Sequence, residues 1–533
     1  MEITPKTKWI AYEKRLLVTS LITGFLFSLL TVYCGMLRTH GAFQPFSLLP
    51  ILWVILWTLV YSAALYLIYT LMNKQIAKAQ KPEGWFSRLT GNGFVVFLVL
   101  VLCWTPIYLG CFPGHFSADS QTQFYSYYNE APYAHHPLLH TEFLGACLMF
   151  GIDQSPEGEA TYGLALYCAI QLILMAIAVG YACWWMRRRK VPVWARLVVT
   201  LFFALHPFYA IWNLCPQKDV LFAAFVMVFC LQLADLWQFG MKPLRLISFI
   251  VIAVLMMLFR NNGVYALALL VPFGIWLAKG KRIRMGVLLT GCMVLYLAIN
   301  NYWIYQVDAE RGSKVEILSV PLQQIGLALK EDPDAFALDT EGVLETLYAD
   351  AGYMPDELYD PQIADYVKWA VDYELLDENL PELFSLWARL LPGHLKQYAE
   401  AFLIQNLPYL LPYSDMLYYF DFHVYQLDYF PIVPHSYIPA LRQICDEYDQ
   451  TLVFMGIPGT RLISDTAFFV WLCIAGLAYA WYRREHGLMA AFGFLIAVWI
   501  TSLLGPVAII RYMLSFFYAV PVLLARLLVP VDA

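Results

Sequence analysis

Long apolar runs separated by short polar stretches fill most of this chain. A run of about 20 apolar residues is long enough to cross the hydrocarbon core of a bilayer as one helix. Clear runs lie at residues 16–37, 46–72, 93–112, 160–186, 194–214, 220–239 and 285–303. Shorter or interrupted runs lie at residues 246–259, 263–278, 462–482, 488–504 and 507–524. The pattern predicts an all-α polytopic membrane protein with about twelve transmembrane helices.

Composition agrees with this pattern. Of the 533 residues, 60% are hydrophobic and only 14% are charged, and the mean hydropathy is +0.59. These values lie outside the range of soluble domains. The 11 cysteines lie mostly inside the apolar runs and show no spacing typical of a disulfide framework. We expect a multi-pass protein of the cell membrane, with no nucleic-acid partner and no cysteine chemistry in its function.

Lysines and arginines predict the orientation of the chain, because short cytoplasmic loops are enriched in them. If all twelve runs cross the membrane, every basic cluster falls on one side. The clusters are Lys6, Lys8, Lys14 and Arg15; Lys74, Lys78, Lys81 and Arg88; Arg187 to Lys190; Lys242 and Arg245; Lys279, Lys281, Arg282 and Arg284; Arg483 and Arg484; and Arg526. Both termini are then cytoplasmic, and the first run is a retained anchor rather than a cleaved signal sequence.

Acidic residues concentrate between the ninth and tenth runs. Residues 304–462 contain 26 acidic and 8 basic residues, whereas the rest of the chain is net positive. We predict a transmembrane region at 1–303 with an outer loop at 113–159, a mainly helical extracytoplasmic domain at 304–461, and a transmembrane region at 462–533. The acidity serves either the solubility of the domain or the repulsion or selection of acidic partners.

The outer loop carries the first candidate residues. Asp119, Ser120 and Gln123 fit the first turn of a helix, so Asp119 is either a cap for that helix or a functional carboxylate. Three histidines follow in the same loop, namely His135, His136 and His140. Their spacing prevents them from sharing one helical face, so we predict no metal site there. Residues 143–151 are typical of a short helix lying in the membrane interface.

Further charged residues stand at the outer ends of other apolar runs. Lys218 and Asp219 begin the sixth run, where Lys218 either neutralises Asp219 or serves a site. Arg260 lies in the turn between two short runs, slightly below the outer surface. Arg511 interrupts the last run about one turn inside its outer end, where it either snorkels to the interface or has a function. Ionisable groups at membrane depth are costly and indicate functional sites.

These positions together predict one outward-facing site with two carboxylates and three cations. A carboxylate such as that of Asp119 can act as general base on a hydroxyl group. Arginine and lysine side chains can hold a phosphate and stabilise its charge as it leaves. An enzyme that uses a lipid-phosphate donor needs this combination at the depth of the phosphate headgroups.

The motifs, in this order, resemble those of the GT-C class of polyprenyl-phosphate-dependent membrane glycosyltransferases, which includes protein O-mannosyltransferases and lipid A aminoarabinose transferases. They are also similar to those of multi-pass membrane proteins of Gram-positive bacteria near that class. The acid that usually follows the first aspartate of the family is replaced by Ser120. The motifs are Pro113-Gly114-x-x-Ser117-x-Asp119-Ser120-x-x-Gln123, His136-Pro137-x-x-His140-Thr141, Lys218-Asp219, Arg260-Asn261-Asn262-Gly263, Ser319-x-Pro321-Leu322-Gln323-Gln324-Ile325-Gly326, and Arg511-Tyr512 with Pro521.

The resemblance implies inverting transfer of a sugar from a lipid-linked donor, a polyprenyl phosphate, to a cell-envelope acceptor on the outer face. Asp119 would be the catalytic base. Arg511, Lys218 and Arg260 would bind the phosphate, and Asp219 would orient Lys218 or contact the sugar. The resemblance implies no metal ligand, and a requirement for a divalent cation stays open. The full set of implied substrate-binding residues is Lys218, Asp219, Arg260, Arg511, Gln123, His136 and His140.

Two other functions remain alternatives. One is a transporter or flippase for an anionic lipid or polysaccharide, which broken helices, inverted repeats and charges at the midplane would mark. The sequence shows no internal repeat, and its charges collect at the outer boundary. The other is a structural factor for envelope assembly, which would have no need for Arg511 at membrane depth. The charges at the outer boundary and the position of Arg511 at membrane depth both favour an enzyme.

Overall fold

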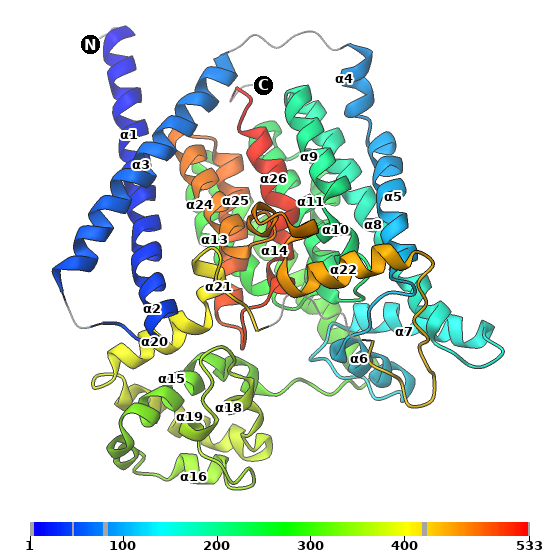
Figure 1. Cartoon of the computed structure of the whole chain (residues 1–533), viewed down its shortest axis with the longest axis vertical. Coiled ribbons are helices and arrows are strands. Elements are labelled where there is room, and N and C mark those ends of the chain that lie inside the picture. Colours follow the sequence, from blue (N-terminus) through cyan, green and yellow to red (C-terminus); the bar gives the residue numbers. More distant parts are fainter. Residues whose placement is uncertain (1–4, 45–46, 78–83, 418–423, 531–533) are drawn as a thin grey trace.

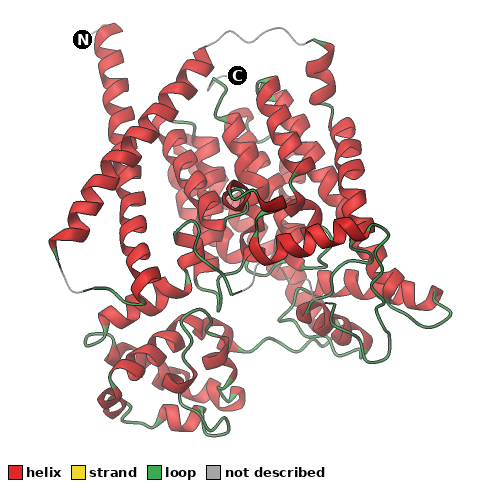
Figure 2. Cartoon of the chain, viewed as in Figure 1, coloured by secondary structure: helices red, strands yellow, loops and turns green. Residues whose placement is uncertain are grey.

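The computed structural model describes residues 5–44, 47–77, 84–417 and 424–530. Figure 2 shows helices joined by loops, and this part of the chain contains no β-strand. Eight of its helical segments are long and apolar enough to cross a membrane. The chain is therefore an all-α polytopic membrane protein, as the apolar runs predict. Of the basic residues that predict the orientation, Lys78 and Lys81 lie outside the described residues.

The eight long segments correspond to eight of the predicted runs, and shorter helices occupy the other four. The long segments contain α1 (Pro5–Leu29), which continues through a π-helical turn (Leu30–Cys34) into α2 (Gly35–His40), and α3 (Leu48–Ala77), α5 (Gly93–Gly110), α8 (Thr161–Arg188), α11 (Lys218–Phe239), α14 (Arg282–Gln306), α24 (Thr466–Arg483) and α25 (His486–Leu503). The shorter helices are α9 (Val193–Leu205), α12 (Pro243–Phe259), α13 (Gly263–Leu277) and α26 (Leu514–Arg526).

Two predicted runs are not single helices. The run at 194–214 divides into α9 and α10 (Pro207–Trp212), because His206 precedes a proline and adopts an extended conformation. The last run begins with extended backbone at Ile509 and a 3-10 turn (Ile510–Met513), so α26 has only 13 residues. The second interruption carries Arg511, one of the charged residues predicted for the site.

Helix α11 lies at the centre of the bundle. Helices α8, α12, α25 and α26 pack around it, and 78% of its membrane-crossing window is buried. Helices α5 and α8 approach closely through Gly93 and Gly180, since a Cβ atom on Gly180 would lie 2.6 Å from the carbonyl oxygen of Gly93. Helices α1 and α3 pair beside the bundle and reach it through α24 (Figure 1).

Residues 314–405, which we call the helical unit, fold around a separate apolar core that includes Leu322, Ile325, Leu383 and Leu386. The unit lies at one end of the bundle, and α1 begins and α26 ends at the opposite end, which we call the termini end (Figure 1). Its helices are α15 (Ser319–Glu331), α16 (Val343–Leu347), α17 (Pro355–Leu358), α18 (Asp365–Trp369), α19 (Tyr373–Leu390) and α20 (Leu395–Gln405).

Short helices complete the fold around the bundle. Two of them, α6 and α7, form a hairpin that precedes α8, and α7 contains the helix predicted at residues 143–151. Segment 424–438 and α22 then cover α6 and the end of α5 (Figure 1). These helices are α4 (Trp85–Thr90), α6 (Ala118–Tyr128), α7 (Leu138–Gln154), α21 (Leu407–Leu410), α22 (Pro439–Thr451) and α23 (Gly459–Leu462).

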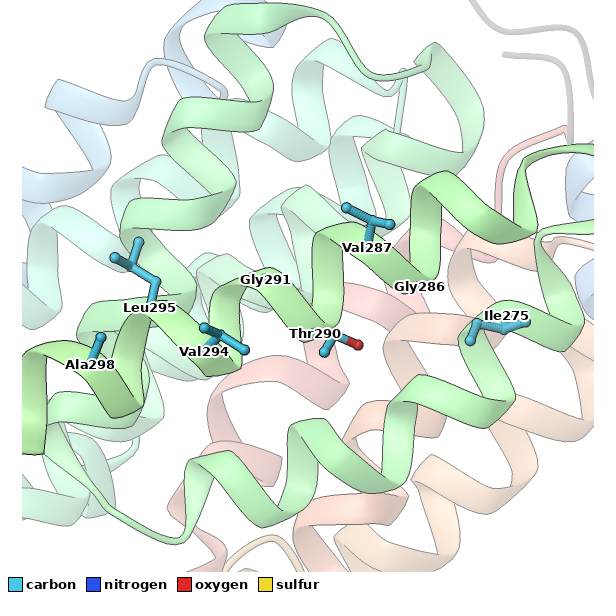
Figure 3. Close-up of a pocket in the computed structure, with 8 residues that line it drawn as sticks. All are labelled: Ile275, Gly286, Val287, Thr290, Gly291, Val294, Leu295 and Ala298. Atoms are coloured by element: carbon cyan, nitrogen blue, oxygen red, sulfur yellow. The ribbon is translucent and has the colours of Figure 1, made fainter.

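A surface groove of about 730 Å³ lies between α13 and α14 (Figure 3). Apolar side chains from both helices line it, with Thr290 as the polar exception, and Gly286 and Gly291 give it depth. None of the charged residues predicted for the site belongs to this lining. The charged residues predicted for the site lie elsewhere, at the end of the bundle that faces the helical unit.

Candidate functional site

Helix α6 is capped by Ser117, so of the two alternatives for Asp119 the capping role is wrong. The Ser117 hydroxyl accepts a hydrogen bond from the backbone N–H of Ser120 at 3.3 Å. Ser120 in turn donates its hydroxyl to the carbonyl of Pro216 at 2.9 Å, which ties α6 to the segment before α11. Asp119 lies in the first turn of α6, where its carboxylate is not needed as a cap and points to side chains from other helices.

The carboxylate of Asp119 binds two cations from distant parts of the chain. Its Oδ2 atom lies 2.9 Å from Nη1 of Arg511 and 3.4 Å from Nζ of Lys218. Burial alone would raise the pKa of Asp119, but the charges of Arg511 and Lys218 outweigh burial and hold that pKa well below its usual range. About a quarter of the side chain, 27%, remains exposed, so a ligand can reach this carboxylate.

Arg511 is fixed from two sides. Its Nη1 atom also donates to the side-chain oxygen of Gln217 at 2.8 Å, and Gln217 donates to the Ser117 hydroxyl at 2.7 Å. Gln217 therefore connects the cap of α6 to the guanidinium group. Because Arg511 is paired inside the protein and only 14% exposed, the alternative of a snorkelling arginine is wrong.

The backbone just before Arg511 is held by the helical unit and by α21. The Pro506 carbonyl accepts from the backbone N–H of Ala364, at 2.7 Å, and the Gly505 carbonyl accepts from the side chain of Gln405, also at 2.7 Å. The Tyr409 hydroxyl accepts a hydrogen bond from the N–H of Ile509 and donates one to the carbonyl of Ile509, both at 2.8 Å. These contacts set the position of the guanidinium through the chain that carries it.

Lys218 and Asp219 are adjacent in sequence but have different partners, so the alternative in which Lys218 neutralises Asp219 is wrong. Lys218 contacts Asp119 and donates to Nδ1 of His136 at 2.9 Å. Asp219 is fully buried and forms an ion pair with Arg260. Successive residues of a helix point about 100° apart, which separates the two side chains. Asp219 therefore neither orients Lys218 by direct pairing nor reaches the surface, contrary to the roles expected from the resemblance.

The ring of Tyr512 contacts both arginines. Its centroid lies 4.6 Å from Cζ of Arg260 and 5.3 Å from Cζ of Arg511. A cation over an aromatic face is attracted by the ring quadrupole, which offsets part of the repulsion between the two guanidinium groups. The two ion pairs, Asp119 with Arg511 and Asp219 with Arg260, are thus neighbours that share one aromatic ring.

His136 faces Lys218 as a neutral acceptor. Burial, together with the positive charge of Lys218, lowers the pKa of His136 well below its ordinary value. The neutral imidazole can then accept a proton of the Lys218 ammonium group at Nδ1. His136 thereby fixes the position of the Lys218 ammonium group.

His140 and Gln123 lie behind this cluster and bond to each other rather than to the Asp119 carboxylate. Nδ1 of His140 lies 2.6 Å from the side-chain oxygen of Gln123, and Nε2 lies 2.8 Å from the Tyr167 hydroxyl. Because the amide oxygen can only accept, Nδ1 carries the proton and Nε2 accepts from Tyr167. Burial lowers the pKa of His140 to about 3, so the ring stays neutral. This chain of hydrogen bonds connects α6, α7 and α8.

We predict that His140 makes the stability of the protein depend on pH. In the unfolded chain its pKa is the ordinary 6.5, whereas in the fold it is about 3. Between these values the unfolded chain binds the extra proton, so stability falls as the pH falls. Lowering the pH from about 7.5 to about 5 is expected to remove about 2 kcal/mol of unfolding free energy through this residue.

Equilibrium unfolding of the purified protein in mixed micelles, measured at both pH values, tests this prediction. His140→Gln should reduce the pH dependence by the share of His140, because glutamine does not titrate, whereas His136 keeps its own share. His435→Gln, at an exposed histidine, should leave the dependence of the parent protein unchanged. Equal pH dependence in the parent protein and in His140→Gln would contradict the prediction.

Several residues of the site were missed by the sequence prediction. Gln217 and Ser117 orient Arg511 and α6, and Tyr167 anchors His140. Gln171 donates to the Cys215 carbonyl at 2.7 Å and so holds the turn before α11. Two of them had a local signal, since Ser117 belongs to the first motif but was given no role, and Gln217 adjoins the charged pair Lys218-Asp219 at the start of a helix.

The charge of the cluster disfavours a metal ion. Among the described residues, no group of three or more His, Cys, Asp or Glu side chains is arranged to hold one. The exposed carboxylate, that of Asp119, already faces the positive charges of Arg511 and Lys218, which would repel a divalent cation. The same two charges would attract an anion.

Comparison with known proteins identifies one family. The DUF6020 family, described as a family of unknown function, matches residues 132–529 of the chain. The match includes Lys218, Arg260 and Arg511, whereas Asp119 and the rest of α6 precede it. No curated protein and no solved structure shows a significant match to the chain.

Proposed function

The chain belongs to the DUF6020 family, whose function is unknown, and we propose that it is a membrane glycosyltransferase. It transfers a sugar from a polyprenyl-phosphate donor to a cell-envelope acceptor. The observation that carries this proposal is the carboxylate of Asp119, which is partly exposed and contacts two cations from separate helices. A phosphate oxygen can replace that carboxylate as the partner of Arg511 and Lys218. The site thus pairs a base with an anion receptor.

The reaction follows from this exchange of partners. The donor phosphate binds Arg511 and Lys218, and neutralisation of these charges lets the pKa of Asp119 rise toward its ordinary value. Asp119 then accepts the proton of the acceptor hydroxyl, whose oxygen attacks the anomeric carbon of the sugar. The bond from that carbon to the phosphate oxygen breaks, and polyprenyl phosphate leaves with its electron pair, stabilised by the two cations. The configuration at the anomeric carbon is inverted.

The remaining site residues support these groups without touching the reacting atoms. His136 holds the Lys218 ammonium, and Gln123 and His140 fix α6 against α7 and α8. The buried pair of Asp219 with Arg260 keeps α11 and the end of α12 in register behind the site. No step requires a divalent cation.

The proposal includes a membrane topology. All twelve apolar runs cross the bilayer in a GT-C-like arrangement, with both termini in the cytoplasm, and two of these runs are interrupted helices. The site then lies at the outer face, with the acidic segment at residues 304–461 above it. The basic clusters at the ends of the apolar runs support this orientation. The cell-envelope acceptor approaches from the side of the helical unit.

Arg511→Gln tests the role of the anion receptor. The purified protein, reconstituted in vesicles, should release polyprenyl phosphate from polyprenyl-phosphate sugars. We expect Arg511→Gln to lower kcat/KM by about 100-fold or more, because one charge that stabilises the leaving phosphate is lost. Product formation is measured by chromatography of the released lipid.

Arg389→Gln provides a matched control, because Arg389 pairs with Glu341 on the surface of the helical unit. It should turn over the donor at the rate of the parent protein. The proposed function is wrong if the parent protein turns over no polyprenyl-phosphate sugar in the presence of membrane extract as a source of acceptors. It is also wrong if Arg511→Gln retains the full rate.

A further inference from the structure

A polar cavity lies at the termini end of the bundle, at the opposite end from Asp119. It has a volume of about 160 Å³ and lies between the end of α8, the end of α11 and the start of α12. Its lining includes Arg188, Arg189, Arg245, Asp235, Trp184 and Ser248. Nothing in the proposed transfer reaction uses these residues.

The carboxylate in this cavity is fully engaged by one arginine and one tryptophan. Asp235 Oδ1 accepts from Nε of Arg189 at 2.9 Å and from the Trp185 indole at 2.9 Å, and Oδ2 pairs with Nη2 of Arg189. The Arg189 guanidinium also lies 3.8 Å from the ring centroid of Phe239. Asp235 therefore serves to hold Arg189 rigidly in the wall of the cavity.

The cavity keeps an excess of positive charge. Three arginines and one aspartate line it, so its net charge is positive after the Asp235–Arg189 pair is formed. Arg188 lies 4.9 Å from the ring centroid of Trp184, and Arg245 donates to the Phe239 carbonyl at 2.8 Å. Neither contact supplies a full negative charge. A concave site with this charge attracts an anion.

Apolar surface adjoins the cavity on the outside of the bundle. Trp184 on α8 is 37% exposed, and Ile247 and Val251 on α12 are 60% and 49% exposed. Tryptophan and arginine at the end of a membrane-crossing helix are typical of the headgroup region. An anion bound here therefore meets hydrocarbon on the neighbouring face, which suits a ligand with acyl chains.

We propose that this cavity binds the phosphate headgroup of an anionic glycerophospholipid. The phosphate contacts Arg188, Arg189 and Arg245, and its acyl chains lie along the exposed apolar residues of α8 and α12. Basic cavities between membrane helices bind such headgroups by the same combination of charges and apolar contacts. This site is independent of the transfer reaction, because it lies at the opposite end of the bundle.

Native mass spectrometry of the full-length protein tests the proposal. The protein is titrated with phosphatidylglycerol, with phosphatidylcholine of the same acyl chains, and with soluble glycerol phosphate. The test variant is Arg188→Gln/Arg245→Gln, which leaves the buried Arg189–Asp235 pair intact. The control is Arg282→Gln/Arg284→Gln, which removes two exposed charges at the start of α14, at the same end of the bundle.

We expect at least one phosphatidylglycerol to bind in preference to phosphatidylcholine. The test variant should bind it about tenfold more weakly, and the control should change by less than about twofold. Equal weakening in both variants, or equal binding of the two lipids, overturns the proposal. Competition by glycerol phosphate at the concentration of the lipid also overturns it, because the ligand is then a soluble anion. If the double variant melts early in phosphatidylcholine micelles, Arg188→Gln alone replaces it under the same criteria.

Discussion

Asp119→Asn should slow sugar transfer strongly while leaving the protein folded. Asparagine keeps the shape of the side chain and the first turn of α6, but it cannot accept the proton of the acceptor hydroxyl at neutral pH. We expect kcat to fall by about 100-fold to 10,000-fold, the range for loss of a general base. The measurement is the initial rate of product formation from a polyprenyl-phosphate sugar by reconstituted protein.

Asp153→Asn is the matched control for this substitution. Asp153 lies near the end of α7 and is exposed, so the same chemical change removes a charge from the same loop region without touching the site. Its rate should equal that of the parent protein. Normal turnover by Asp119→Asn, with an unchanged melting temperature, would falsify the role of Asp119 as base.

The largest effect on stability is expected from Asp219→Asn. The change leaves the Arg260 guanidinium, which is only 9% exposed, without its anionic partner. Removing one member of a buried ion pair costs about 3–5 kcal/mol, because the other charge remains desolvated. Equilibrium unfolding in mixed micelles of increasing sodium dodecyl sulfate content measures this loss.

Two further variants separate burial from loss of charge. Asp377→Asn breaks the ion pair of Lys314 with Asp377, in which both side chains are more than half exposed, and it should have little measurable effect. Asp219→Leu/Arg260→Met removes both buried charges and should recover much of the stability lost in Asp219→Asn. If Asp377→Asn and Asp219→Asn lowered stability equally, the buried pair would not have the importance assigned to it.

Simple sequence rules predicted that the chain is a membrane protein and that the charged residues of the site lie at one end of its helix bundle. Apolar runs locate the long helices, and the alternation of helices brings Asp119, Lys218 and Arg511 to the same end of the bundle. In the structure both Lys218 and Arg511 contact the carboxylate of Asp119. This shared location is predictable because each end of a membrane-crossing helix lies at one of only two faces of the membrane.

The ion pairs and hydrogen bonds that the side chains of the site form were not predictable from the sequence. Whether Lys218 pairs with Asp219 or with Asp119 depends on the rotation of α11, which packing against α8, α12 and α26 determines. The hydrogen bond from Ser120 to the Pro216 carbonyl joins residues 96 positions apart, and no local pattern indicates it. The break of the run at 194–214 is different, since Pro207 is visible in the sequence and disfavours helix at the preceding residue.

The hydrogen bonds that hold the backbone of residues 505–509 have a mechanical consequence. Ala364 and Gln405, in the helical unit, grip a segment that ends two residues before Arg511. Any shift of the helical unit relative to the bundle would therefore move the backbone that carries Arg511, and with it the guanidinium group. Under the proposed function, an acceptor that contacts the helical unit would change how Arg511 binds the donor phosphate without touching the arginine itself.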